Sequence, residues 1–214
     1  MTRKGRKKRF VVGIAGSSGS GKTTFANRIV QECRRIGIKS QNFPLDNYYR
    51  PLSHLALKER MAYNFDHPDA IEFTLAAQQL RALSEGRRVR MPVYDFKLHT
   101  RERRAALRRP TDLIVVEGLY ALYPAELLAL YDYKLFVSTG LATAILRRVQ
   151  RDISERGRDM ENAKHQILST VLPMYETYVR PTQKNAHFSI NWEGEEIPDK
   201  ATEGIVRMLR DHFR

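Results

Sequence analysis

The most informative functional motif in this chain is residues 16–23. They read Gly-Ser-Ser-Gly-Ser-Gly-Lys-Thr and match the pattern G-x-x-x-x-G-K-[ST]. The glycines have no side chains to shield the backbone, so successive N–H groups can point at phosphate oxygens. In such a loop Lys22 reaches the β- and γ-phosphates, and the Thr23 hydroxyl binds Mg²⁺. The pattern therefore predicts a site for a nucleoside triphosphate. The residues assigned to it are Gly16, Ser17, Ser18, Gly19, Ser20, Gly21, Lys22, Thr23 and Thr24.

The elements that flank this loop are the ones that such a site requires. A strand-like run, residues 10–15, leads into it, and an amphipathic helix pattern follows over residues 22–36. The helix N-terminus adds its partial positive charge to the anion site. A chance glycine- and serine-rich loop is the alternative interpretation, and it explains neither the strand before nor the helix after.

Two carboxylates follow strand-like segments elsewhere in the chain. Glu117 ends the apolar run 113–116 and precedes Gly118, a position from which it could hold Mg²⁺ or the water shell of Mg²⁺. Asp46 follows the second strand-like segment, at residues 40–44. It could accept the proton of an attacking hydroxyl, or it could simply be a turn residue. Position alone leaves those two roles near even.

Strand and helix patterns alternate along the chain, which predicts an α/β fold with a doubly wound parallel sheet and ligands at the carboxyl ends of its strands. With the phosphate loop, this is the fold class of a P-loop NTPase. The expected strands are 10–15, 40–44, 112–117, 133–138 and 187–191. The expected helices are 22–36, 74–85, 124–130, 143–155, 161–178 and 199–213. Residues 89–96 alternate like an extended segment, which predicts an inserted β-ribbon at about 87–101.

Length and composition fit one domain, residues 10–214, preceded by a basic tail at residues 1–9. The formal net charge is +13, and the tail supplies six cations. Such a tail is most often disordered and solvated, and a nucleic-acid arm is the less favoured interpretation. Cys33 is the only cysteine, so no internal disulfide is expected. With neither a secretory segment nor a membrane span in the pattern, a cytoplasmic protein is expected.

Several longer motifs occur in a consistent order. They are Asn-Phe-Asp-His-Pro-Asp-Ala at 64–70, Pro-Val-Tyr-Asp-Phe at 92–96 with His99 and Arg101, Val-Glu-Gly at 116–118, and Arg-Asp-Ile-Ser-Glu-Arg-Gly-Arg-Asp at 151–159. Together with the phosphate loop, they resemble the uridine–cytidine kinase family over roughly residues 10–185. Phosphoribulokinase and bacterial pantothenate kinase share the general fold and loop, but are not expected to share the motif at 64–70.

The resemblance implies roles for individual residues. Asp46 matches the catalytic aspartate of the family, and Asp66 matches a carboxylate that contacts the ribose hydroxyls. Arg151 and Arg156 look like arginines of a helical lid, at about 148–166, that reach over the phosphates beside Lys22. The nucleoside-binding residues implied by the resemblance are Tyr49, Asp66, Tyr94, Phe96, His99, Arg148, Arg158 and Gln166. Taken singly, the aromatic residues could be core and the arginines could form a solvated helix face.

The chain departs from the family after the expected last strand. The family pattern there is Ile-Pro-x-Gly, whereas residues 190–196 read Ile-Asn-Trp-Glu-Gly-Glu-Glu. This loop contacts the adenine of the donor in the family, so Trp192 and Glu195 are assigned to donor binding. Trp192 could instead cap the edge of the sheet. The departure leaves ATP and GTP both open as the donor.

The leading hypothesis is an ATP- and Mg²⁺-dependent kinase that converts uridine or cytidine to its 5′-monophosphate, a reaction of pyrimidine salvage. A related small-molecule kinase with another acceptor alcohol is the runner-up. A nucleotide-dependent nucleic-acid-binding protein is a third hypothesis, based on the tail and on the basic region 87–109, but no nucleic-acid-binding motif supports it. The family resemblance also implies a homotetramer.

Overall fold

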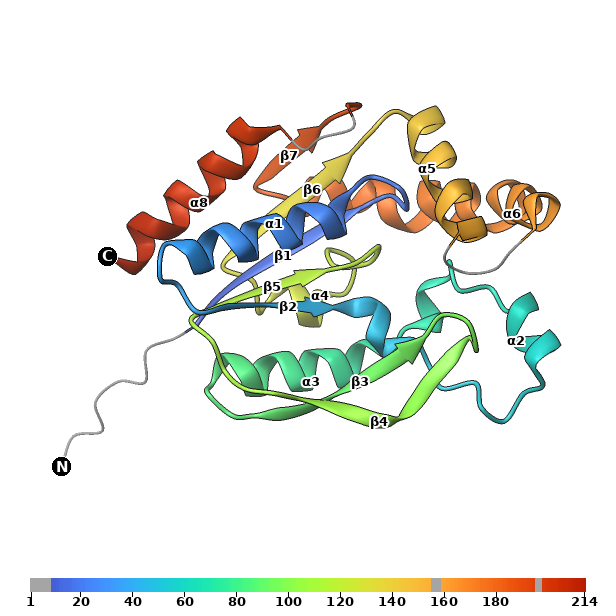
Figure 1. The fold of residues 1–214 in the computed structure, drawn as a ribbon, viewed down its shortest axis with the longest axis horizontal. Coiled ribbons are helices and arrows are strands. Elements are labelled where there is room, and N and C mark those ends of the chain that lie inside the picture. Colours follow the sequence, from blue (N-terminus) through green and yellow to red (C-terminus); the bar gives the residue numbers. More distant parts are fainter. Residues whose placement is uncertain (1–8, 155–158, 195–197) are drawn as a thin grey trace.

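A computed structural model describes residues 9–154, 159–194 and 198–214. Figure 1 shows a central sheet with helices on both sides and a β-ribbon beside it. Of the predicted basic tail, only Arg9 lies within the described residues. No helix among the described residues is long and apolar enough to cross a membrane.

Across the described residues, five parallel strands form the main sheet. In spatial order they are β2 (Ser40–Pro44), β5 (Leu113–Glu117), β1 (Phe10–Gly16), β6 (Tyr133–Ser138) and β7 (Phe188–Asn191). The predicted doubly wound parallel sheet is confirmed, with strand ends within one or two residues of those expected. This order brings β2, β5 and β1 side by side, so their carboxyl ends lie along one edge.

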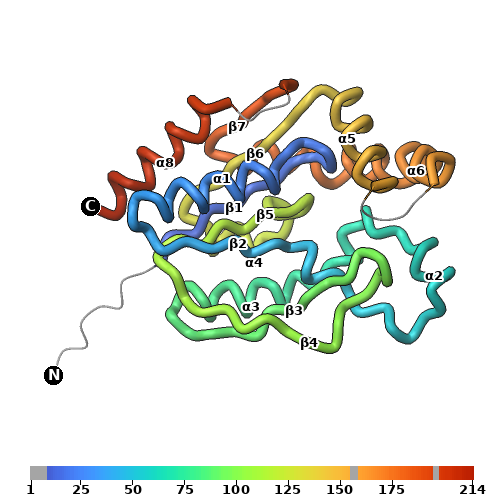
Figure 2. Tube along the Cα trace, in the orientation of Figure 1, coloured from blue at the N-terminus to red at the C-terminus, as the bar shows by residue number. Residues whose placement is uncertain are grey.

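Each face of the sheet packs against its own layer of helices, which is why the strands are apolar on both sides. Along β1, Val12 and Ile14 belong to the core under α1 (Lys22–Arg35) and α8 (Asp199–Phe213), whereas Val11 belongs to the core on the opposite face. That opposite face packs on α3 (Phe73–Ser84) and α4 (Ala125–Leu128). Figures 1 and 2 show α1 and α8 on one side of the sheet and α3 on the other.

The predicted ribbon is present and is longer than expected. It consists of β3 (Val89–Asp95) and β4 (Thr100–Arg108), which pair antiparallel from Asp95↔Thr100 to Val89↔Arg108. The sequence did not indicate the length of β4, because arginines on both of its faces hide the alternation of a strand. The ribbon is fixed to the domain by Arg101, whose guanidinium contacts Glu72 at 2.8 Å and the carbonyl of Tyr48 at 2.8 Å.

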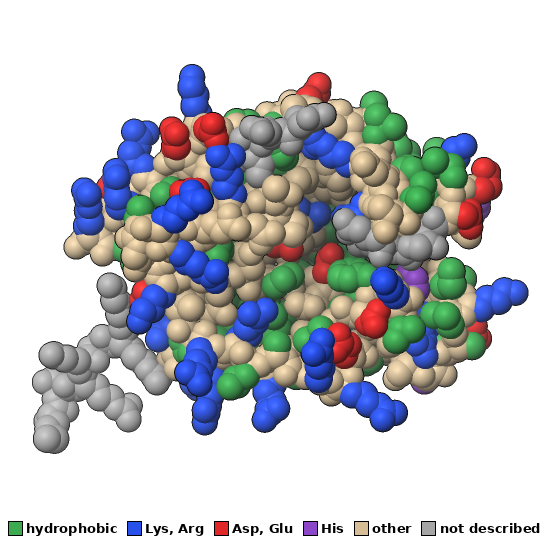
Figure 3. All heavy atoms as spheres, viewed as in Figure 1, with side chains coloured by type: hydrophobic (Ala, Val, Ile, Leu, Met, Phe, Trp, Pro, Cys, Tyr) green, Lys and Arg blue, Asp and Glu red, His purple; other side chains and the backbone are tan. Residues whose placement is uncertain are grey.

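Lysine and arginine side chains gather along the ribbon side of the face shown in Figure 3. Arg103 and Arg104 are exposed on β4, and Arg88 and Arg109 are exposed near the base of the ribbon. The basic region predicted at 87–109 is therefore mostly a solvated surface, apart from Arg101.

The predicted helix at 161–178 is interrupted. It consists of α6 (Met160–Gln166), a π-helical turn at Ile167–Val171, α7 (Leu172–Met174) and a second π-helical turn at Tyr175–Val179, and a 3₁₀ segment at Arg180–Asn185 follows. Pro173 lies between the two π turns and lacks a backbone N–H, which interrupts the regular hydrogen-bond ladder. This segment follows α5 (Leu141–Ser154), and the two form the helical arm of the molecule, described over residues 141–154 and 160–179.

Leu80→Ala tests the core on the α3 side of the sheet, where Leu80 is fully buried. We expect a loss of about 2–5 kcal/mol in the free energy of unfolding, because the substitution leaves a cavity against the sheet. Chemical denaturation of the purified variants measures this loss. Leu98→Ala is the matched control, since the Leu98 side chain is 52 % exposed. Equal losses in the two variants would contradict the assigned packing.

Candidate active site

The phosphate loop joins β1 to α1 and wraps around a buried lysine. Lys22 is 8 % exposed, and its Nζ donates a hydrogen bond to the carbonyl of Ser17 at 3.5 Å. Gly19 and Gly21 have φ values of 80° and 84°, in the left-handed region that favours glycine. A Cβ on Gly21 would also overlap the indole of Trp192. The glycines are therefore required both by conformation and by close packing.

The carboxylates predicted at two strand ends lie beside this lysine. The parallel register pairs Ile14 of β1 with Glu117 of β5, and Glu117 with Pro44 of β2. Asp46 follows Pro44 in the 3₁₀ turn Leu45–Tyr48. The Thr23 hydroxyl donates a hydrogen bond to Oε2 of Glu117 at 2.9 Å. The two residues assigned to the metal are thus in direct contact.

Burial governs the charges of this cluster. It lowers the pKa of Lys22, while the negative charges of Glu117 and Asp46 oppose that shift. Burial also raises the pKa of Glu117 to about 7, and the like charge of Asp46 adds to the rise, while Lys22 opposes it. Two carboxylates therefore share one buried ammonium group. Carboxylate oxygens are donors that suit Mg²⁺.

A cavity of about 340 Å³ opens from this cluster towards the ribbon and the helical arm. It brings together residues predicted from five separate parts of the sequence. Those lining it are Ser18, Lys22, Asp46, Tyr49, Asp66, Tyr94, Phe96, His99, Arg148, Arg151 and Gln166. The phosphate end and the expected acceptor pocket are thus one continuous space.

Aromatic rings line the ribbon end of the cavity. Phe65 stacks on the His99 ring at 5.6 Å between centroids, and Tyr94 meets Phe96 edge-on at 5.1 Å. His99 is 5 % exposed and has a φ of 50°, the only positive φ among the described residues other than glycine. Such a backbone persists only where the surroundings hold it in place. The turn between β3 and β4 therefore points His99 into the cavity.

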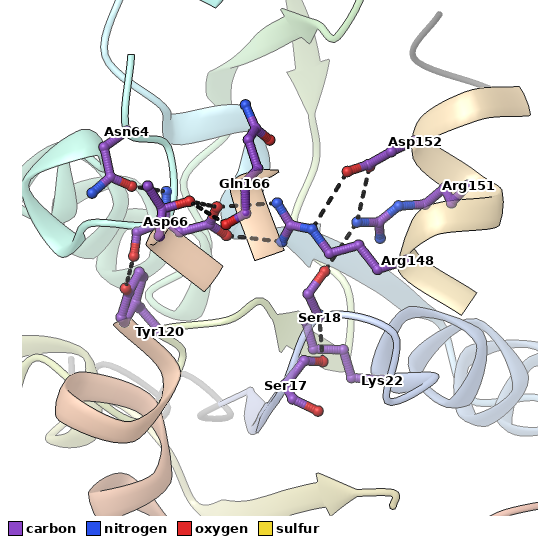
Figure 4. Close-up of polar contacts among 11 residues, drawn as sticks. Ser17, Ser18, Lys22, Asn64, Asp66, Tyr120, Arg148, Arg151, Asp152 and Gln166 are labelled. Atoms are coloured by element: carbon purple, nitrogen blue, oxygen red, sulfur yellow. Dashed lines mark hydrogen bonds and ion pairs between the residues drawn. The ribbon is translucent and has the colours of Figure 1, made fainter. Parts of the chain in front are cut away.

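A buried ion pair ties the helical arm to the cavity (Figure 4). The two terminal nitrogens of Arg148 donate to the two carboxylate oxygens of Asp66 at 2.8 and 3.0 Å. The backbone N–H of Asp66 bonds Oδ1 of Asn64 at 3.1 Å, and its carbonyl accepts a hydrogen bond from the Tyr120 hydroxyl. The carboxylate assigned to the ribose is therefore already oriented by the protein.

Sequence reasoning missed part of the lining. It gave no role to Phe65, although this residue lies inside the motif at 64–70, and it gave none to Tyr63. It also missed α2 (Leu57–Ala62), a short helix with no buried residue and hence no apolar periodicity. On the arm, Ser169 and Thr170 also line the cavity. The Thr170 hydroxyl lies 3.4 Å from Oδ2 of Asp66, to which it donates a hydrogen bond.

Trp192 lies beneath the phosphate loop and is 7 % exposed. Its Nε1 donates a hydrogen bond to the carbonyl of Ser20 at 2.6 Å, and the guanidinium of Arg147 lies 5.1 Å from the ring centroid. These contacts favour the supporting role that the sequence left open, and stacking on the donor base stays a prediction. The predicted residues Arg156, Arg158 and Glu195 lie outside the described residues.

The profile of the Phosphoribulokinase / Uridine kinase family matches residues 11–198. This range includes the phosphate loop, Glu117 and every described residue that lines the cavity.

The chain belongs to this family.

Two relatives show how much of the chain the similarity covers. A protein named uridine kinase from Halobacterium salinarum is 39 % identical over 202 residues, which cover 94 % of this chain and 85 % of the relative. Another of that name, from Lactobacillus johnsonii, is 40 % identical over 207 residues, 95 % of each chain.

Solved structures support the fold. A D-glycerate 3-kinase from Cryptococcus neoformans aligns with a TM-score of 0.65 at 15 % identity, over 89 % of each chain. A shikimate kinase from Bacteroides thetaiotaomicron aligns with a TM-score of 0.52 at 14 % identity, over 95 % of this chain and 98 % of that one. At these identities the likeness shows the fold alone.

Glu117→Gln tests the electrostatics of the buried cluster. The folded state raises the pKa of Glu117 from 4.5 to about 7, so its contribution to stability is present below pH 4.5 and is lost as the pH rises through 7. At pH 8 the neutral amide should therefore raise the Tm of the ligand-free protein. A gain on the order of 1 kcal/mol corresponds to about 2–4 °C in a chain of this size.

Thermal unfolding at pH 8 without nucleotide or Mg²⁺ measures this change. Glu126→Gln, on α4 and outside the cavity, is the matched control and should leave the Tm unaltered. A clear fall in the Tm of Glu117→Gln would show that the carboxylate stabilises the fold.

Proposed function

We propose that the protein is a nucleoside kinase that transfers the γ-phosphoryl group of ATP to the 5′-hydroxyl of uridine or cytidine. The observation that carries the proposal is the single cavity with Lys22 and Asp46 at one end and Tyr94, Phe96 and His99 at the other. Identity near 40 % to two proteins named uridine kinase supports the acceptor class.

The acceptor base would lie among the aromatic rings of the ribbon end. Tyr94 and His99 carry polar groups that can pair with the polar edge of a pyrimidine, while Phe96 and Tyr49 offer faces for packing. Asp66 and Arg148 would face the ribose, and Arg158 and Gln166 are proposed as further contacts. In this orientation the 5′-hydroxyl points towards Asp46 and the phosphate loop.

Catalysis would then consist mainly of positioning and charge stabilisation. Phosphoryl transfer passes through a loose transition state, with charge spread over the γ-phosphoryl oxygens. Lys22, Arg151 and Arg156 would neutralise that charge. Asp46 would hold the 5′-hydroxyl in line and accept its proton late in the reaction. An ordinary carboxylate is a weak base, so orientation matters more than proton abstraction.

The residues at the phosphate end fit a divalent cation. Thr23 and Glu117 are in contact, and the raised pKa of Glu117 reflects a carboxylate whose charge the protein alone leaves poorly compensated. These two residues would hold Mg²⁺, directly or through water. When bound, the ion supplies positive charge to the β- and γ-phosphate oxygens.

The proposed donor site and assembly rest on family resemblance, and the proposed location rests on the sequence pattern. ATP is the proposed donor, with GTP as the alternative, and Trp192 and Glu195 are proposed near its base. The proposed assembly is a homotetramer, and the proposed location is the cytoplasm.

A steady-state kinase assay over a panel of acceptors tests the proposal. The panel contains uridine, cytidine, adenosine, guanosine, pantothenate and ribulose 5-phosphate, each with ATP and Mg²⁺. We expect turnover with uridine or cytidine well above that with the other acceptors. Turnover with pantothenate or ribulose 5-phosphate alone would contradict the assigned acceptor class.

Asp46→Asn keeps the shape of the side chain but removes the proton acceptor. It should lower kcat for the nucleoside by at least ~10²-fold, the lower range for a general base, and leave the affinity for ATP nearly unchanged. Asp199→Asn is the matched control, since the Asp199 side chain is 71 % exposed on α8. If Asp46→Asn kept near-normal turnover, Asp46 would have no part in the chemistry.

His99→Ala removes a polar partner of the base from the ribbon end. A polar group of the base left unpaired in a buried pocket costs roughly 1–3 kcal/mol, which corresponds to about a 10- to 100-fold rise in the KM for uridine. The KM for ATP in the same assay serves as the internal control and should not change. A variant that lost affinity for ATP and kept that for uridine would show that the pocket is misassigned.

A further inference from the structure

The side chains of one turn of α5 connect the two ends of the cavity. Arg148, Arg151 and Asp152 lie in this turn, and Figure 4 shows all three pointing towards the region between Asp66 and the phosphate loop. Arg148 and Asp152 are nearly inaccessible, with side chains 7 % and 2 % exposed. Asp152 is not among the residues that line the cavity.

Asp152 lies between two guanidinium groups. Its Oδ2 is 3.4 Å from Nε of Arg148, and its Oδ1 is 3.8 Å from Nη2 of Arg151. The contact with Arg148 is buried on both sides, so its charges are weakly screened, whereas the Arg151 side chain is 31 % exposed and the contact with Arg151 is screened more strongly. A buried carboxylate of this kind cannot leave one arginine without a large desolvation penalty. The positions of the two arginines are therefore linked through Asp152.

Each arginine also contacts a different end of the cavity. Arg148 holds both carboxylate oxygens of Asp66 on the acceptor side. Arg151 donates a hydrogen bond from Nη2 to Oγ of Ser18, in the phosphate loop, at 3.0 Å. The result is a continuous series of contacts from Ser18 through Arg151, Asp152 and Arg148 to Asp66.

We propose that Asp152 is a positioning residue that couples the donor loop to the acceptor pocket. Phosphate groups entering the loop shift the Ser18 hydroxyl that Arg151 contacts, and Asp152 passes the resulting change in Arg151 to Arg148 and so to the carboxylate of Asp66. Donor binding thereby orders the surface on which the acceptor lies. The acceptor half of this statement rests on the proposed function, whereas the coupling between the loop and Asp66 does not.

Hydrogen–deuterium exchange tests the coupling without any acceptor. In the wild type, the non-hydrolysable donor AMP-PNP with Mg²⁺ should slow exchange in peptides that cover the loop at 16–24 and also in those that cover 63–71 around Asp66. In Asp152→Asn, the loop should still be protected and the protection at 63–71 should be lost. Asp211→Asn, on α8 with a side chain 58 % exposed, removes the same charge and should behave as the wild type does.

Ser18→Ala provides a second variant that leaves the buried charges in place. It removes the hydroxyl that Arg151 contacts and should also abolish protection at 63–71, so the inference remains testable if Asp152→Asn does not fold. Protection at 63–71 that persists in a folded Asp152→Asn variant, or in Ser18→Ala, would overturn the inference. The inference would also be overturned if, in the wild type, AMP-PNP with Mg²⁺ protected the loop but left exchange at 63–71 unchanged.

Calorimetric titration of uridine tests whether donor binding changes the affinity for the acceptor. Saturating AMP-PNP with Mg²⁺ should tighten uridine binding by about 5-fold or more in the wild type, within the usual range of coupling between sites, and by less than about 2-fold in Asp152→Asn. Equal tightening in both proteins would overturn the inference. Uridine that binds to neither protein, with the exchange result as expected, would instead contradict the proposed acceptor and leave the coupling established.

Discussion

The register of three parallel strands places Lys22, Glu117 and Asp46 within range of one another's charges. Because Glu117 pairs with Ile14 on one side and with Pro44 on the other, the residues that follow β1 and β2 must meet at its carboxylate. A slip of one residue in either pairing would turn Glu117 to the opposite face of the sheet. The remaining parts of the site are built outward from this point.

The acceptor side depends on contacts that cross the sequence. The Arg148–Asp66 pair joins α5 to the motif at 64–70, and it is buried on both sides. A buried ion pair adds little net stability compared with apolar packing, because both charges must leave water. Its value here is orientation, since two parallel hydrogen bonds fix the carboxylate in one plane. The same pair joins the helical arm to the pocket.

Local patterns predicted the sheet and the phosphate loop, whereas the predicted residues on the acceptor side of the cavity came from the family resemblance. The structures of residues 16–23 and of the apolar run 113–116 are determined by residues adjacent in the sequence, so motif and periodicity were sufficient to predict them. Three features were beyond that reach. The length of β4 depends on pairing with β3, the π turns depend on Pro173 and on packing of the arm, and the partner of Asp66 comes from a helix 82 residues away. The Arg148–Asp66 contact is the long-range one, and no window of sequence contains it.

The outer edge of β4 has a consequence for association between copies of the protein. A two-stranded ribbon that projects from a domain offers unpaired backbone groups, which invite strand addition and aggregation. On β4 this edge carries exposed Arg103 and Arg104. Two such edges brought together would set like charges side by side, which opposes their pairing. The protection is electrostatic, so it weakens as added salt shortens the screening length. Colloidal stability of the protein should therefore be greatest at low ionic strength.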